Sequence, residues 1–91
     1  LKFTRMILGG GAVGGARVLK EETVKLMGQN AIGDIVVPPF VSDNPAMALS
    51  ADLFPGQIAR WGLSFVINTE ALPGGRAANS LAWAGVHNTF Y

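Results

Sequence analysis

An aromatic residue followed by two small ones is the clearest candidate for chemistry in this sequence. Trp83, Ala84 and Gly85 stand in a run with strand character. A small residue and a glycine after an aromatic side chain let a substrate or another backbone come close. A glycine bulge in a core strand gives the same pattern, and the residues taken alone favour the bulge. The triplet therefore needs further support before it counts as the wall of a binding site.

The ionisable side chains do not form an evident catalytic or metal-binding set. His87 is the only histidine and cysteine is absent, so a zinc site of the usual His and Cys composition is not predicted. A lone histidine on a strand is more often a packed or hydrogen-bonded side chain than a base. Glu21, Glu22 and Glu70 fall at a helix start and in a loop, where nothing pairs them as acid and base. We expect no metal and no cofactor.

Two short motif matches are better explained as turns. Residues 9–14 fit Gly-x-Gly-x-x-Gly, but a dinucleotide site needs a buried strand before the glycines and a helix opening on them. Lys2, Thr4 and Arg5 make the preceding segment a poor buried strand, so a helix stop followed by a turn is the better interpretation. Residues 42–44 read Ser-Asp-Asn, a triplet of some serine β-lactamases. Before Pro45 the same residues also form an ordinary turn.

Composition indicates a chain that does not bury its apolar residues by itself. Of its 91 residues 49% are hydrophobic and 14% charged, and a domain this small buries only a modest part of its surface. We expect the missing apolar partner to be the remainder of the same, larger protein. The net charge of +1 comes from scattered residues, so no nucleic-acid partner is predicted. No apolar run approaches the roughly 20 residues that span a bilayer.

The first third of the chain predicts two helices. Apolar residues at Leu1, Phe3 and Met6 to Leu8 fit an amphipathic helix that the glycines from Gly9 stop. A second helix should begin near Lys20 or Glu21, with carboxylates in its first turn. We expect Val24 and Met27 to form its buried stripe and residues 28–30 to end it. Residues 31–59, interrupted by prolines, should be irregular.

The last third predicts a β-hairpin. Residues 61–68 and 80–91 alternate in a period near two and carry β-branched and aromatic side chains, which is typical of two antiparallel strands. Leu81, Trp83, Gly85 and His87 should share one face of the second strand. The connection between the runs contains Pro73, Gly74 and Gly75 and should be a surface loop. Because the strand pattern is still running at Tyr91, we expect the chain to be a piece of a longer one.

Four segments in order resemble a known family. They are residues 3–11 (FTRMILGGG), 15–27 (GARVLKEETVKLM), 61–65 (WGLSF) and 80–85 (SLAWAG). Together they resemble the C-terminal part of the serine β-lactamase-like hydrolases, most closely the family VIII carboxylesterases, which are relatives of class C β-lactamases and D-alanyl-D-alanine peptidases. The resemblance implies an α+β fold with an antiparallel sheet flanked by helices. Residues 1–91 would be the C-terminal portion of one such domain.

The resemblance also assigns a site. The third motif of the family is Lys-Thr-Gly in β-lactamases and Trp-x-Gly in these esterases, and residues 83–85 match the esterase form. This implies that Trp83, Ala84, Gly85 and His87 contact a small ester substrate. It further implies that the backbone N–H of Val86 supplies half of the oxyanion hole, where a rigid donor stabilises the developing negative charge.

The sequence departs from the family in lacking the residues that react. No serine is followed three positions later by lysine, and no Tyr-x-Asn occurs. The nucleophilic serine, its lysine and the tyrosine base would all precede Leu1, so this chain alone should be inactive. The parent is expected to cleave short-chain carboxylic esters through an acyl-serine. A β-lactamase or D-alanyl peptidase relative and a non-catalytic homologue or structural module stay open. The resemblance places the parent in the bacterial cytoplasm or periplasm.

Overall fold

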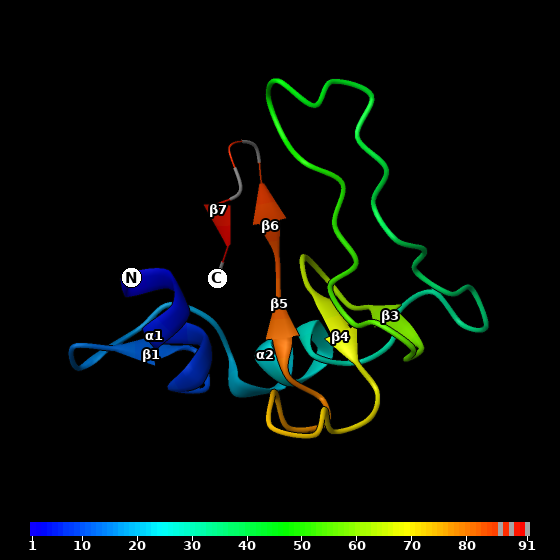
Figure 1. Cartoon of the computed structure of the whole chain (residues 1–91). Helices are drawn as coiled ribbons and strands as arrows, with labels where there is room; N and C mark the ends of the chain where they lie inside the picture. Colours follow the sequence, from blue (N-terminus) through cyan, green and yellow to red (C-terminus); the bar gives the residue numbers. More distant parts are fainter. Residues whose placement is uncertain (86, 88, 91) are drawn as a thin grey trace.

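The computed structural model of the chain is a small α+β structure with two helices and short antiparallel sheets (Figure 1). It describes residues 1–85, 87, 89 and 90. In chain order the elements are α1 (Lys2–Leu8), β1 (Ala12–Val13), β2 (Ala16–Arg17), α2 (Glu21–Met27), β3 (Ala59–Trp61), β4 (Val66–Asn68), β5 (Leu81–Ala82), β6 (Ala84–Gly85) and β7 (Thr89–Phe90). The predicted α+β class is confirmed. In the described part of the chain, no helix has the length and apolar character needed to cross a membrane.

Helix α1 ends in a glycine turn, as predicted. The N–H of Gly9 donates to the Arg5 carbonyl at 2.8 Å, and the N–H of Gly11 donates to the Met6 carbonyl at 2.8 Å. Gly11 has a positive φ of 99°, and a Cβ there would collide with the Leu19 carbonyl, so only glycine fits. The chain then folds into the β1–β2 hairpin. Since a helix precedes the glycines and a hairpin follows them, the turn interpretation of residues 9–14 is confirmed.

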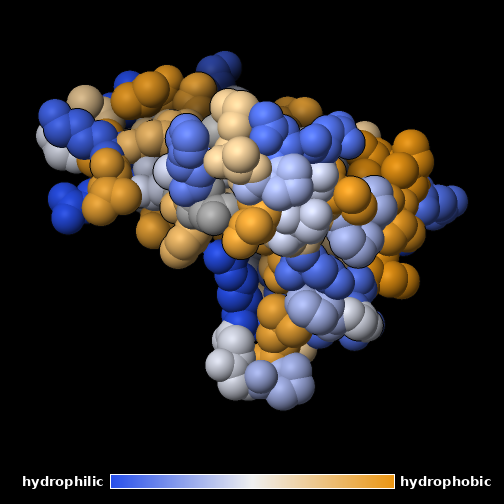
Figure 2. Space-filling view, turned by 45° about the horizontal axis from the view of Figure 1, so that its top comes forward, coloured by the Kyte–Doolittle hydropathy of each residue, from blue (hydrophilic) through white to orange (hydrophobic). Residues whose placement is uncertain are grey.

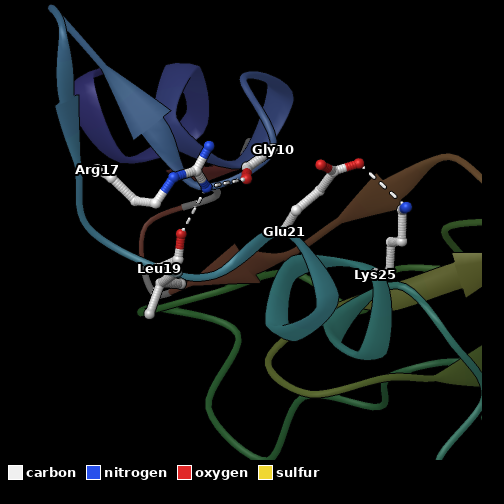
Figure 3. A network of polar contacts seen from close by, with 5 residues as sticks. All are labelled: Gly10, Arg17, Leu19, Glu21 and Lys25. Carbon is white, nitrogen blue, oxygen red and sulfur yellow. Dashed lines mark hydrogen bonds and ion pairs between the residues drawn. The ribbon is translucent and has the colours of Figure 1, made fainter.

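Arg17 fastens this hairpin to the chain that follows it (Figure 3). Its Nη1 donates to the Gly10 carbonyl at 3.1 Å and to the Leu19 carbonyl at 3.0 Å. The two acceptors lie on opposite sides of the hairpin in sequence. The Arg17 guanidinium therefore links the two ends of the segment that connects α1 to α2.

Helix α2 begins and ends where the sequence predicts, but its inner face is only half-buried. No residue of α2 is fully buried, and Val24 and Met27 are both partly exposed, so the prediction of a buried stripe was wrong. At the surface, Lys25 Nζ lies 3.0 Å from Glu21 Oε1 and forms an ion pair with it (Figure 3). The hydrogen bond and the charge of Lys25 lower the pKa of Glu21. Any resulting stability is present above the ordinary carboxyl pKa and is lost as the pH falls through the lowered one.

The central sheet has the order β3-β4-β5, and both pairings are antiparallel. The predicted pairing between the two C-terminal runs is confirmed by β4 and β5. Residues 61–68, however, are not one strand. Gly62 donates to the Phe65 carbonyl at 2.8 Å and Ser64 has a positive φ of 77°, so the chain reverses between β3 and β4. Gly62 also lies against the Met27 carbonyl, where a Cβ would collide. The turn therefore packs against the C-terminal end of α2.

The second run is also divided. Strand β6 pairs with β7 in the register Ala84 opposite Phe90 and Gly85 opposite Thr89, so the chain turns back after Gly85. The expectation that Leu81, Trp83, Gly85 and His87 share one face of a single strand was therefore wrong. His87 has a positive φ of 59°, which is typical of a turn and not of a strand.

Residues 34–58 leave the sheet as a long irregular arm and return to it (Figure 1). Its two limbs are joined by an isolated β-bridge between Phe40 and Ala51. The Phe40 N–H donates to the Ala51 carbonyl with an N to O distance of 2.8 Å, and the Ala51 N–H donates to the Phe40 carbonyl at 2.9 Å. At its tip, Ser42 Oγ accepts from the Asn44 N–H and Asn44 Oδ1 accepts from the Ala46 N–H. The interpretation of residues 42–44 as a turn is thus confirmed, and so is the irregular character of the arm.

The core is small and centred on β4. Val66 and Asn68 are fully buried, and Phe54, Ala59 and Ala82 pack around Val66. Many apolar side chains remain outside it: Leu8 is 88% exposed, Val41 81% and Phe90 78%. Figure 2 shows such hydrophobic side chains on the surface, interspersed with hydrophilic ones. The expectation that this composition leaves apolar surface exposed is confirmed.

Asn68 is the one buried polar side chain among the described residues, and it organises the loop after β4. Its Nδ2 donates to the carbonyls of Glu70 and Ala77, each at 2.8 Å. Its backbone carbonyl accepts from the Asn79 N–H at 2.8 Å. Both ends of the predicted surface loop are therefore held by one residue of the core.

We expect Asn68→Ala to destabilise the fold by about 1–3 kcal/mol, because two hydrogen bonds are lost from a fully buried position. The buried Oδ1 atom has no partner, so its removal offsets part of the loss. The measurement is chemical denaturation of the two proteins. Glu70→Ala is the matched control, since this exposed neighbour should change stability by less than about 0.5 kcal/mol. Equal effects of the two substitutions would contradict the role given to Asn68.

Candidate substrate pocket

A cavity of about 330 Å³ lies between the arm and the strands that carry the Trp-x-Gly match. Trp83, Ala84 and Gly85 line one side of it. The remaining lining residues are Phe40, Ala48, Leu49, Ala51, Leu53, Arg76 and Phe90. The walls are thus mainly aliphatic and aromatic, which suits an apolar group of a small molecule.

Trp83 is held in this wall by two aromatic contacts. The centroid of its ring lies 4.8 Å from that of the Trp61 ring, at an interplanar angle of 80°. It lies 5.7 Å from the centroid of the Phe40 ring, at an angle of 78°. Edge-to-face pairs at such distances are favourable because ring edges and faces carry opposite partial charges. Trp61 belongs to β3 and Phe40 to the arm, so Trp83 connects the sheet to the segment that closes the cavity.

The far wall depends on few contacts. The bridge between Phe40 and Ala51 holds the base of the arm, and the Ser42 N–H donates to Ser50 Oγ at 3.0 Å above it. The backbone N–H of His87 donates to the Met47 carbonyl at 3.2 Å. The β6–β7 turn therefore reaches the arm through main-chain atoms.

The predicted site residues are only partly brought together. Trp83 and Ala84 are half-buried and Gly85 is exposed at the cavity. The His87 side chain is exposed and does not line the cavity. Val86, the predicted oxyanion-hole donor, lies outside the described residues, so its assignment stays a prediction.

Among the residues that line the pocket outside the predicted triplet, sequence reasoning singled out neither Phe40 nor Arg76. Phe40 comes from the irregular arm, and only its position after Pro38 and Pro39 marked the segment as unusual. Arg76 is the cationic residue among those that line the cavity. It follows a Pro-Gly-Gly run that predicts only a loop, and the clamp on that loop comes from Asn68. The irregular stretch 31–59 was expected to help form the mouth of the pocket, but no local signal singled out Phe40 within it or indicated the placement of Arg76.

The described residues around the cavity form no evident reaction centre. No group of three or more His, Cys, Asp or Glu side chains comes together in residues 1–85, 87, 89 and 90. Ser42 and Ser50 serve the turn and the limbs of the arm. What the pocket offers chemically is an apolar cleft with one cation at its edge.

Comparisons with protein-family models, with curated proteins and with solved structures find no match to this chain. The resemblance to β-lactamase-like hydrolases consequently depends on the four sequence segments alone.

The contact between Phe40 and Trp83 should be measurable as a coupling free energy. We expect a double-mutant cycle with Phe40→Leu and Trp83→Leu to give about 0.5–1.5 kcal/mol of favourable interaction. The measurement is the unfolding free energy of the four proteins of the cycle.

The matched control combines Trp83→Leu with Phe3→Leu. Phe3 stacks on Phe65 at 6.1 Å, away from the arm, so the two effects should add within about 0.5 kcal/mol. Additivity of the Phe40 and Trp83 substitutions would show that the arm is not held through this pair.

Proposed function

We propose that this chain is the C-terminal part of a β-lactamase/transpeptidase-like serine hydrolase that cleaves short-chain carboxylic esters. The observation that carries the proposal is the position of residues 83–85. The triplet that matches the esterase form of the family motif lines an apolar cavity of about 330 Å³. Trp83 and Ala84 are only half-buried and Gly85 is exposed, which does not fit the fully buried core bulge that the residues alone favoured.

The reaction divides between this chain and a segment outside it. The hydroxyl oxygen of a serine in that segment attacks the ester carbonyl while a base takes its proton. The alcohol leaves with a proton, and water then releases the acid from the acyl-serine. The backbone N–H of Val86 and that of the nucleophile stabilise the oxyanion formed in both steps. The Trp83 wall binds the apolar part of the ester.

Exposed apolar surface supports the idea that more protein packs on this chain. A second cavity of about 570 Å³ opens between α1, α2 and the start of β5, lined by Ile7, Leu8, Val24, Phe65 and Leu81 among others. Large apolar surfaces on a small protein usually mark interaction sites. In the proposed parent, the remainder of the domain covers this one.

The proposal predicts ester hydrolysis by the complete natural protein and none by residues 1–91 alone. The measurement is release of 4-nitrophenol from its acetate and butyrate esters, together with sensitivity to a serine-directed phosphonate. A cephalosporin and a D-alanyl-D-alanine peptide separate the family alternatives. Turnover by the 91-residue chain above background would contradict the proposed division of the site. An inactive complete protein would favour a non-catalytic homologue.

Replacing the Val86 amide by a backbone ester through semisynthesis should slow acylation by about 10²–10³-fold, because one oxyanion-hole donor is lost. KM should change little, since the ground-state carbonyl needs the donor less than the oxyanion does. The measurement is kcat and KM of the complete protein on one short ester.

His87→Ala is the neighbouring control. The His87 side chain is exposed and does not line the cavity, so kcat should fall by less than about tenfold. The loss of a general acid or base would instead lower kcat by about 10²–10⁴-fold. Near-normal kcat for the Val86 ester, with activity abolished in His87→Ala, would assign the chemistry to the other residue.

A further inference from the structure

A third cavity, of about 250 Å³, lies where the arm leaves and rejoins the sheet. Its apolar walls include Val37, Pro39, Phe40, Phe54 and Val66. Val66 is fully buried and Phe54 nearly so, so the floor of this cavity is the hydrophobic core itself. The volume is just below the roughly 300 Å³ at which pockets for drug-sized molecules begin. A ligand here must be small.

Two residues whose side chains carry hydrogen-bond acceptors, Asp52 and Gln57, line this cavity, and one acceptor atom of Gln57 is buried without a partner. Gln57 Nε2 donates to the Ala71 carbonyl at 3.1 Å. This contact fixes which end of the amide is nitrogen, because a flipped amide would set oxygen against oxygen. Gln57 Oε1 is buried and has no hydrogen-bond partner. Buried acceptors are nearly always paired with protein, water or ligand.

The second acceptor is the carboxylate of Asp52. Its Oδ1 accepts from the Phe54 N–H at 3.1 Å, which leaves further acceptor positions on both oxygens. The Gln57 N–H donates to the Phe54 carbonyl at 3.0 Å, so Asp52 and Gln57 are both fixed to the same core residue. No cationic residue lines the cavity, and within the described residues the one ion pair is that of Lys25 with Glu21.

From these contacts we infer that the cavity binds a small primary amine with an apolar body. The ammonium group donates to Gln57 Oε1 and to the Asp52 carboxylate, and a short alkyl or aryl group packs on Phe54 and Pro39. An ammonium has three donors and no acceptor, which matches the unpaired Gln57 Oε1 and the free acceptor positions of the Asp52 carboxylate. Water would pair with Gln57 Oε1 too, but it would leave the apolar walls in contact with solvent, whereas an amine with an apolar body covers them. None of Trp83, Ala84 and Gly85 lines this cavity, so the inference does not depend on the proposed esterase function.

The first test uses three probes of similar shape and different charge on the unmodified complete protein. Calorimetry with 2-phenylethylamine, 2-phenylethanol and 3-phenylpropionate should show the amine binding at least about tenfold more tightly than the alcohol, since a charge-assisted hydrogen bond is gained. The carboxylate should bind weakest. Equal affinity for the amine and the alcohol, or no binding of the amine, would overturn the inference and leave an apolar or water-filled cavity.

The second test locates the binding. Asp52→Asn keeps an acceptor for the Phe54 N–H but removes the charge, and Gln57→Met keeps the length of the side chain but removes Oε1. Each should weaken amine binding by about tenfold or more, and the affinity for the alcohol should fall less. Asp43→Asn, in the exposed turn of the same arm, is the matched control and should leave both affinities unchanged.

Thermal melting without ligand shows whether each variant is folded. If Gln57→Met does not fold because the hydrogen bond from Gln57 to the Ala71 carbonyl is lost, Asp52→Asn and the three probes decide whether the amine binds in this cavity. Amine binding that survives Asp52→Asn unchanged would overturn the assignment of this site.

Discussion

The candidate site depends on Trp83 being held between two other rings. Its contacts with Trp61 and Phe40 run from strand β3, across the start of β6, to the arm. The strands around it are two or three residues long, so backbone pairing alone does not fix the arm. An edge-to-face pair adds about 0.5–1.5 kcal/mol beyond burial, and the Phe40–Trp83 pair therefore helps to hold the arm against the strands. Two of these rings, Phe40 and Trp83, line the 330 Å³ cavity together with Ala84 and Gly85.

A second constraint comes from the interior of the sheet. Asn68 holds both ends of the following loop, and that loop brings Arg76 to the same cavity. Burial of this polar side chain is tolerated because both N–H groups of its Nδ2 donate to backbone carbonyls, those of Glu70 and Ala77. Asn68 is the last residue of the buried strand β4, and Arg76 lies eight positions further along the chain. A core residue thus sets the polar edge of the pocket.

The sequence predicted those elements whose cause is local. Helix α1 and its stop follow from apolar periodicity and three glycines, α2 from the carboxylates near Glu21, and the irregular arm from its prolines. It failed where tertiary packing decides. The alternation in residues 61–68 indicates one strand, yet Gly62 fits under the Met27 carbonyl and the chain turns there. Phe40 and Arg76 reach the pocket through contacts distant in sequence, which no pattern of neighbouring residues can show. The family resemblance located residues 83–85, and the assignment of Val86 stays a prediction.

The arm joins the two cavities that matter most. Phe40 and Leu53 line both the Trp83 pocket and the cavity that contains Gln57, so each of these side chains has one cavity on either side. The arm has a single bridge in place of a regular sheet, and its position therefore depends on what these two residues contact. A ligand changes a conformational equilibrium only by the difference in its affinity for the two states. Any molecule that fits one cavity better with Phe40 displaced would also reshape the other. Because Phe40 contacts Trp83 edge-to-face, such a displacement would first separate this pair and would move the wall opposite Gly85.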